Sequence, residues 1–317
     1  MGKAKKTITV MRRIFSLIIA AAVFSGLLCI GAVLLFGYLD NPPVSQSAEG
    51  FVLKIEECET GIGITRKLSE NQLIRSDVFF KFLMKIQKYE NSIKTGTYRI
   101  EPGMKSSEIL AMLVEGKEML VKVQIPEGSL TSTVAAILEI SGVVSKNDFL
   151  NSVKDPALLQ SLEIPGTSAT GYLFPDTYYF PLGASAKTVV ETMVRTFRKK
   201  IADKLPSARF FSAAELHERV IMASIIEREY QRAEEAPIIA GVFYNRLKIS
   251  MPLQSCATVV YIITEELGKK HPSRLFETDL QIKSPYNTYI NPGLPPGPIC
   301  NPGMVGISAA IAPEPSR

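Results

Sequence analysis

Glu227 is the residue of this chain whose type and position most clearly suggest chemistry. On a helix that begins at Leu216, with about 100° between successive residues, Glu227 lies about 20° from Leu216 and beside Val220. Glu218 and Glu229 fall on a different face, which suits water. A carboxylate on an apolar stripe is costly unless it stays protonated or gains a partner. Glu227 is therefore a candidate general acid. The structural alternative is a buried glutamate bound by an arginine or by backbone amides.

Motifs of several other enzyme classes are absent from the sequence. The two histidines, His217 and His271, fit neither an HExxH nor a Cys/His zinc spacing. No GxSxG elbow, P-loop or GxGxxG motif is present, which excludes serine-hydrolase, nucleotide and dinucleotide sites of those kinds. We expect no metal and no cofactor, and we expect His217 to be solvated. The remaining chemistry, carboxylates with amides, hydroxyls and aromatics, is typical of a carbohydrate-active site.

The N-terminus predicts a membrane anchor. Residues 14–39 carry no charge over 26 positions, which is long enough to cross a bilayer with some tilt. Five basic residues and no acid precede this run, so the positive-inside rule places residues 1–13 in the cytoplasm and everything after Asp40 outside. A cleaved signal peptide is the alternative, but the run is too long and no small-residue cleavage site stands at its end. We predict a retained transmembrane helix.

Charge and cysteine content limit the partners and the cross-links. The net charge is +5, but removing the five N-terminal basic residues from the 36 leaves 31 against 31 acidic residues. The exported part is therefore neutral, and we expect no nucleic-acid partner. Of the four cysteines, Cys29 lies in the apolar run, which leaves an odd number outside. The sequence leaves open whether Cys256 and Cys300 form a bridge.

The exported part divides into a linker and two domains. Residues 40–50 predict a polar Pro/Ser linker. Residues 51–117 predict a small subdomain, and its expected elements are a strand at 51–55, helices around Ile64 and from Ser76, a hairpin-like segment at 96–100 and a helix at 106–114. Part of it recurs, because residues 61–80 and 128–150 share a glycine, a helix, a short turn and a second capped helix. A strand-helix-helix module is thus used twice.

Residues 118–317 predict a mixed domain, so the fold class is α+β. The aromatic segment 171–180 is expected to be strand or loop, and residues 186–205 form a helix. Ser212 and Glu215 form a capping box that opens the Glu227 helix. Pro237 begins a further helix at 238–247, and residues 253–264 look partly extended. Residues 284–303 are an ordered loop or groove wall, and the ending at 312–317 leads us to expect a chain cut short.

Six motifs together resemble one known family. They are GYLFPDTYYF (171–180), ASIIERE (223–229), YNRL (244–247), LQS (253–255), TVVY (258–261) and SPYNTY…GLPPGPICNPG (284–303). Any one of them is weak, but all six in this order resemble the endolytic murein transglycosylase family, the YceG-like or MltG proteins. The resemblance implies a single-pass protein of the bacterial inner membrane with its N-terminus in the cytoplasm, a LysM-like subdomain and an extracytoplasmic catalytic domain. It also implies association with peptidoglycan synthases, the penicillin-binding proteins.

Three departures from the family pattern stand out. The family often has Glu before GYLFPDTY, and here that residue is Thr170. The Asp-Pro pair of the family's LQ[ST]DPT is replaced by Cys256-Ala257, which removes a carboxylate from that position. The family also continues past the Ala-rich helix that starts near Ser308. None of these changes Glu227.

The resemblance implies that Glu227 is the catalytic acid of a lytic transglycosylase, which cleaves the MurNAc-β-1,4-GlcNAc bond and leaves 1,6-anhydroMurNAc ends. Amides, hydroxyls and aromatics suited to sugars are the candidate binding residues: Tyr172, Ser224, Tyr244, Asn245, Gln254, Thr258, Tyr286, Asn287 and Thr288. For the aromatic residues, packing in the core is the competing role. Two other functions stay open. One is a lysozyme-type hydrolase with Asp176 or Glu229 as a second acid, and the other is a non-catalytic glycan-binding scaffold.

Overall fold

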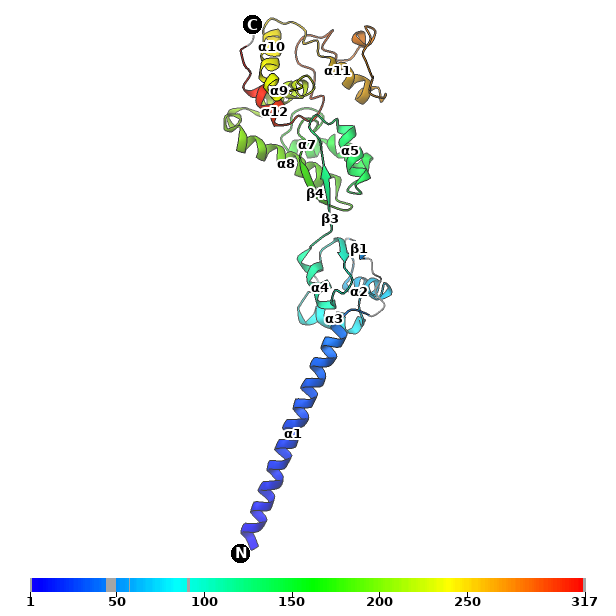
Figure 1. Cartoon of the computed structure of the whole chain (residues 1–317), viewed down its shortest axis with the longest axis vertical. Coiled ribbons are helices and arrows are strands. Elements are labelled where there is room, and N and C mark those ends of the chain that lie inside the picture. The colour runs from blue at the N-terminus through cyan, green and yellow to red at the C-terminus, as the bar shows by residue number, and fades with distance from the viewer. Residues whose placement is uncertain (1, 44–49, 57, 90–91, 316–317) are drawn as a thin grey trace. The chain divides into compact units, whose positions relative to one another are not determined.

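The computed structural model describes residues 2–43, 50–56, 58–89 and 92–315, and the side chains from Phe15 onward (Figure 1). Most of the linker predicted at 40–50 lies outside the described residues. The chain divides into two compact units, residues 1–119 and 120–317. The fold is a mixture of helices and small sheets, 53% helical, as the α+β expectation requires.

The first unit begins with one long helix, α1 (Gly2–Asp40). Its segment Phe15–Asp40 is long and apolar enough to cross a membrane, and within the described residues no other helix is. The predicted run at 14–39 is therefore helical. This helix is compatible with a single-pass anchor, and a signal sequence would have the same composition.

The folded part of the first unit is built on two antiparallel strands. Strand β1 (Phe51–Ile55) pairs with β2 (Gly96–Ile100), so that Leu53 lies opposite Tyr98. The segment 96–100 is thus not a local hairpin, because its partner lies more than 40 residues earlier in the chain. Helices α2 (Gly61–Glu70) and α3 (Asp77–Ile86) connect the strands, and α4 (Ser106–Glu115) follows them.

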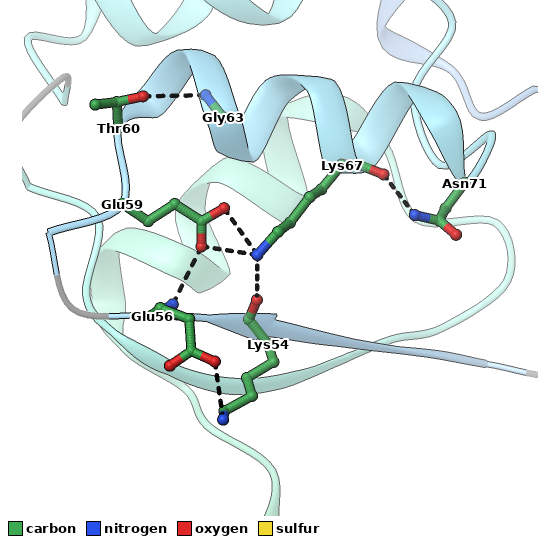
Figure 2. A network of polar contacts seen from close by, with 7 residues as sticks. All are labelled: Lys54, Glu56, Glu59, Thr60, Gly63, Lys67 and Asn71. Carbon is green, nitrogen blue, oxygen red and sulfur yellow. Dashed lines mark hydrogen bonds and ion pairs between the residues drawn. The ribbon is translucent and has the colours of Figure 1, made fainter.

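Side-chain caps and an ion-pair network fix the start of α2 (Figure 2). The Thr60 hydroxyl accepts a hydrogen bond from the Gly63 amide, as an N-cap does. Lys67 binds the Glu59 carboxylate at 2.8 Å and donates to the Lys54 carbonyl at 3.1 Å, which ties α2 to β1. The apolar faces of α2, α3 and α4 bury a core against the two strands, and its largest fully buried members are Ile64, Leu68, Phe80, Tyr98, Ile100, Ile109, Leu110 and Leu113.

The first half of the second unit repeats this order of elements. Strand β3 (Leu120–Gln124) pairs antiparallel with β4 (Thr177–Pro181). Helices α5 (Thr131–Ile140), α6 (Lys146–Val153) and α7 (Pro156–Ser161) lie between them in sequence. A strand followed by two helices therefore occurs in both units, as the internal similarity predicted. A returning strand also pairs with the first strand in each unit, after the additional helix α7 in the second unit. The aromatic segment at 171–180 enters β4 as expected.

The second half of this unit is helical and carries the long loop. Its helices are α8 (Ala186–Lys204), η1 (Pro206–Phe210), α9 (Ala213–Ile226), η2 (Ala233–Glu235), α10 (Ala236–Lys248), α11 (Cys256–Tyr261), the π-turn η3 (Ile262–Glu266), η4 (Asp279–Gln281) and α12 (Met304–Ile311). The Ser212–Glu215 capping box is present, and Pro237 lies in the first turn of α10. These local predictions are confirmed.

The expectation of partly extended structure at 253–264 is wrong, because α11 and the π-turn occupy this segment. Its β-branched residues favour strand by propensity, but tertiary packing overrides that preference. Val259 and Ile262 are buried, and Thr258 donates back to the Ser255 carbonyl at 2.8 Å within the first helical turn. The segment 284–303 is an ordered loop, as predicted.

Candidate active site

Glu227 ends helix α9 and does not lie inside it. It is the C-cap, with helical backbone angles, and its amide donates to the Ala223 carbonyl at 2.8 Å. The expected apolar stripe is present, because Val220 and Ala223 are fully buried. Glu218 and Glu229 are exposed, as predicted. The position at the C-terminal end of a helix also disfavours a negative charge, since the helix dipole is negative there.

The Glu227 carboxyl group has two hydrogen-bond donors. The Tyr230 hydroxyl donates to Oε1 at 3.0 Å, and the Gly303 amide donates to Oε2 at 3.1 Å. Burial raises the pKa of Glu227 to about 7, and the nearby Glu127 charge acts in the same direction, while these hydrogen bonds oppose the increase. The group can thus hold a proton near neutral pH, and its carboxylate form still has partners. This is the condition for one residue to act first as acid and then as base.

Two glycines lie beside carboxyl groups of the site. A methyl group at Gly303 would come within 2.1 Å of Glu127 Oε1, and one at Gly306 would come within 2.6 Å of Glu227 Oε2. Gly303 is the N-cap of α12 and Gly306 lies in its first turn. Helix α12 packs against α9, so its N-terminal end faces the carboxyl group. Close approach of the α12 backbone to the buried Glu227 carboxyl group accounts for glycine at 306, whereas the contact at Gly303 is with the exposed Glu127 side chain, which can move away.

A loop far away in the sequence forms another side of the site. Gly128 has a φ of +68°, and a Cβ atom added to it would lie 3.5 Å from Glu227 Cγ. Its amide donates to the Asn301 carbonyl at 2.9 Å. The neighbouring Glu127 is exposed and is the second carboxylate near Glu227. Sequence reasoning did not identify Glu127, Tyr230 or the two glycines. Only Tyr230, three residues after Glu227, carried a local signal.

Asn301 joins two of the quoted motifs to the 128–130 loop. It is fully buried, and its side-chain oxygen accepts from the Gly171 amide at 2.8 Å and the Leu173 amide at 3.3 Å. Its side-chain nitrogen donates to the Ser129 carbonyl at 3.0 Å. Asn301 thus binds the 171–173 turn and the 128–130 loop to the loop that supplies Gly303. Removing this amide would leave several buried groups unpaired.

Ser224 holds the same loop against α9. Its hydroxyl is fully buried, donates to the Ile221 carbonyl at 2.7 Å and accepts from the Ile299 amide at 3.0 Å. The buried Cys300 thiol donates to the Ser224 carbonyl at 3.2 Å. Cys256 is exposed, with its sulfur 3.0 Å from the Tyr289 hydroxyl, so the bridge left open by the sequence is not formed.

Five of the nine predicted binding residues are at most 4% exposed: Tyr172, Ser224, Thr258, Asn287 and Thr288. The Thr258 and Thr288 hydroxyls lie 2.9 Å apart, and Thr288 accepts from the Ser255 amide at 3.1 Å. Asn287 donates to the Leu280 and Ile282 carbonyls, in and just after η4. Contact with a substrate stays a prediction for these residues, and their hydrogen bonds favour a role in holding the loops.

The other four are at least partly exposed. Gln254 is exposed at a φ of +53°, and its amide donates to the Thr288 carbonyl at 2.9 Å. A residue other than glycine in this backbone region is uncommon and often marks a functional position. Tyr244 donates to the Ala310 carbonyl at 2.8 Å. The Tyr286 ring packs against the Tyr261 ring at a tilt of 38°, with centroids 4.7 Å apart. Asn245 is half-buried on α10.

His217 is not solvated as expected. Its Nδ1 lies 2.9 Å from the Tyr172 hydroxyl, and the two rings are stacked with centroids 5.9 Å apart. Burial lowers the pKa of His217. The side of α9 that carries His217 is therefore partly buried, whereas the helical pattern assigned it to water. Thr170, which replaces the family's glutamate, is buried and lies 2.8 Å from the Thr131 hydroxyl.

The two alternative acids are engaged elsewhere. Asp176 forms a 2.8 Å ion pair with Lys200. Partial burial acts to raise the pKa of Asp176, but the bond to Lys200 and the Thr177 amide lower it overall. Glu229 is exposed and accepts a hydrogen bond from Ser255. Among the described residues, no group of three or more His, Cys, Asp or Glu side chains is placed to hold a metal ion.

Comparisons with known proteins agree on one family. The family described as YceG-like matches residues 53–317. The chain is 31% identical over 304 residues to the "Endolytic murein transglycosylase" of Bacillus subtilis (strain 168), covering 90% of this chain and 82% of that protein. It is 28% identical over 326 residues to the protein of the same name from Streptococcus pneumoniae serotype 2, covering 93% of this chain but 58% of that longer protein.

A solved structure is similar as well. The 2.6 Å crystal structure of a putative yceG-like protein from Listeria monocytogenes superimposes with a TM-score of 0.54 at 32% sequence identity. The similarity covers 85% of this chain and 91% of that chain. Both sequence and structure therefore place the similarity over most of this chain.

Proposed function

The chain belongs to the YceG-like family, and from this we propose that it is an endolytic peptidoglycan lytic transglycosylase. It cleaves the β-1,4 bond between N-acetylmuramic acid and N-acetylglucosamine inside glycan strands and so ends their elongation. The observation that carries the proposal is the Glu227 carboxyl group, whose pKa is raised to about 7 and which keeps two hydrogen-bond donors. The relatives named as transglycosylases supply the substrate class.

In the first step Glu227 acts as a general acid. Its proton passes to the glycosidic oxygen as the bond from that oxygen to the muramyl C1 breaks, and the sugar centre becomes oxocarbenium-like. Glu227 then carries a negative charge. The Tyr230 hydroxyl and the Gly303 amide, already bound to its two oxygens, stabilise that charge. Because both donors are in place beforehand, little reorganisation accompanies the proton transfer.

In the second step Glu227 acts as a general base. The muramyl C6 hydroxyl attacks C1, the C1–O6 bond forms, and the hydroxyl proton returns to Glu227. The product has a 1,6-anhydro end, and Glu227 is regenerated without water. A second carboxylate at the distance of a retaining or inverting glycosidase is therefore not required. Asp176 is bound to Lys200 and Glu229 is exposed and bound to Ser255, so neither of these two acids supports the hydrolase alternative.

The first unit is proposed to anchor the enzyme and to bind glycan. An open hollow of about 370 Å³ lies where β1 meets α2, beside the network of Figure 2, and it is lined by Ile55, Glu56, Cys58, Glu59, Thr60, Gly61, Ile64, Ile93 and Thr95. Its carboxylates and hydroxyl suit sugar hydroxyls and amides. A LysM-like role for residues 51–117 and association with penicillin-binding proteins rest on the family resemblance. Deleting 51–117 should weaken action on sacculi.

Digestion of peptidoglycan tests the function. The full-length protein in detergent should convert glycan strands to fragments with anhydromuramyl ends, lighter by one water than hydrolytic fragments in mass spectrometry. Glu227→Gln should lower the rate by about 10²–10⁴-fold, since glutamine cannot deliver a proton. Glu218→Gln, on the exposed face of the same helix, is the matched control and should leave the rate unchanged. Hydrolytic ends, or a Glu227→Gln variant with near wild-type rate, would refute the mechanism.

A further inference from the structure

The C-terminal end of α1 is bound to the folded part of the first unit. Asp40 is 8% exposed. One of its carboxylate oxygens accepts from the Ser107 amide at 2.8 Å, and the other accepts from the Ser107 hydroxyl at 2.9 Å. Ser107 lies in the first turn of α4, where a carboxylate is favoured by the unpaired amides and the helix dipole. The apolar helix is therefore fixed to this unit at its end.

Aromatic contacts extend this attachment to α3. The rings of Phe36 and Phe79 meet edge to face with centroids 5.0 Å apart. The Arg75 guanidinium lies 4.4 Å from the centre of the Tyr38 ring, and Arg75 donates to the Pro42 carbonyl at 2.9 Å. Figure 1 shows α3 beside this end of α1, with β1 drawn away from it. The last turns of the apolar helix thus contact the start of α3.

The length of the apolar helix determines where these contacts lie relative to the bilayer. Phe15–Asp40 has 26 residues, so it is about 39 Å long at about 1.5 Å per residue. The hydrocarbon layer of a bilayer is about 30 Å thick. A helix centred in that layer leaves it close to Phe36 and Tyr38, and tyrosine is enriched at that boundary. Helix α3 therefore starts at the level of the lipid headgroups.

Helix α3 has exposed apolar side chains at the depth of the headgroups. Val78, Phe82 and Ile86, at positions i, i+4 and i+8, are 77%, 48% and 62% exposed, and Ile62 of α2 is 68% exposed. Val78, Phe82 and Ile62 line an open hollow of about 570 Å³. The Phe82 ring lies 6.4 Å from that of Phe79. Apolar contacts are therefore continuous from the membrane helix to the exposed face.

Basic residues accompany this apolar face. Lys81 and Lys85 line the same hollow, and between Ser76 and Lys88 the sequence has three lysines and one acid, Asp77. Each lysine near an anionic membrane surface contributes about 1 kcal/mol of attraction. An apolar helix face flanked by lysines is the pattern of a helix that lies in the membrane interface.

We propose that the outer face of α3, formed by Val78, Phe82, Ile86, Lys81 and Lys85 together with Ile62, lies in the headgroup layer of an anionic membrane. This proposal rests on the proposed anchoring by α1. Lipid is favoured over a second copy of the chain because the face continues the surface of the membrane-spanning helix and carries cationic residues. The first unit would then lie on the membrane itself and would not extend from it on a flexible tether.

A single introduced tryptophan tests this placement, because the chain contains none. Phe82→Trp is made in the full-length protein, and Val52→Trp is the matched control, since Val52 in β1 has the same 48% exposure and does not line the hollow. Each variant is inserted into vesicles of phosphatidylglycerol and phosphatidylcholine. Flotation with the vesicles reports insertion of α1, and circular dichroism reports folding.

The expected result for the Phe82→Trp variant is a blue-shifted indole emission that lipids brominated near the headgroup quench at least about twofold, as for a side chain at the acyl boundary. The Val52→Trp emission should stay that of a water-exposed indole. Replacing Lys81 and Lys85 by glutamate should reduce the quenching in anionic vesicles.

A protein that floats but whose Phe82→Trp emission is red-shifted and unquenched overturns the inference alone. A blue-shifted but unquenched emission also overturns it, because protein, such as a second copy, then covers the face. A protein that does not float overturns the anchor as well.

Discussion

Replacing Gly306 by alanine would test whether the Glu227 carboxyl group is held where the structure places it. Gly306 lies in the first turn of α12 and has no left-handed backbone angle, so alanine can adopt its conformation. By helix propensity alone, alanine should stabilise the helix by about 1 kcal/mol. The added methyl group, however, would lie 2.6 Å from Glu227 Oε2 and 3.0 Å from the Ala223 carbonyl oxygen.

The clash sets the size of the expected effect. Ordinary contact with a Cβ atom begins near 3.4 Å. Because a methyl group added to a packed core displaces its neighbours, Glu227 Oε2 must move by about 0.8 Å. That movement lengthens the 3.1 Å hydrogen bond from the Gly303 amide. A displacement of about 1 Å at a reacting group costs about 10²-fold in rate. We therefore expect the rate of glycan cleavage to fall about 10²-fold while the folded structure persists.

The assay is the release of anhydromuramyl ends, followed together with thermal unfolding. Gly63→Ala is the matched control, because Gly63 lies in α2 without a left-handed backbone angle and the nearest atoms to its added methyl are at 3.5 Å. That variant should keep its activity and lose no stability. If Gly306→Ala cleaves glycan at the wild-type rate, the carboxyl group is not constrained by α12.

Three further predictions concern the protonation of Glu227. Because burial raises its pKa to about 7 and the protonated form is the acid, kcat/KM should fall about tenfold per pH unit above about pH 7, and a flat profile to pH 9 would exclude Glu227 as the acid. The same shift, from 4.5 to about 7, means that the folded state binds the proton more tightly, so stability falls by about 3 kcal/mol as pH rises through that interval. Glu227→Gln should therefore unfold at a higher temperature than the wild type at pH 8 but not at pH 4, and an equal difference at both pH values would contradict this. Tyr230→Phe removes the donor to Oε1, so the pKa of Glu227 should rise and the alkaline limb of the kcat/KM profile should move to higher pH. A midpoint of that limb that stays or falls would show that this hydrogen bond does not act on the carboxylate.

Several long-range features were not accessible from the sequence. The segment 96–100 carries the signal of a hairpin, but its partner is β1, which no local pattern identifies. Residues 253–264 have β-branched character, yet they form α11 because the surrounding loops bury Thr258 and Val259. Glu127 lies 100 positions before Glu227 and belongs to no motif that suggested chemistry.

The candidate binding residues illustrate the same limit. Hydroxyls and amides in a loop have the same sequence signature whether they bind a sugar or hold the loop together. In this chain the Thr258 and Thr288 hydroxyls bond to each other, and Thr258 also donates to a backbone carbonyl. Asn287 likewise donates to backbone carbonyls. Gln254 is exposed, and its left-handed backbone angle is visible only in the structure. Burial decides between the two roles, and burial depends on the whole fold.

The sequence by itself determined the features that depend on neighbours within a few positions. Two such features are the capping box at Ser212 and Glu215 and the apolar stripe that carries Glu227, which follow from backbone hydrogen bonding and helical periodicity. A third is the charge-free run of the N-terminal helix, which follows from composition alone. The tertiary structure decided the pKa of Glu227, because that value arises from burial between α9 and α12 and from the Gly303 amide, 76 residues away. Electrostatic environment is set by atoms that approach through space, and their approach is fixed only when the chain has packed.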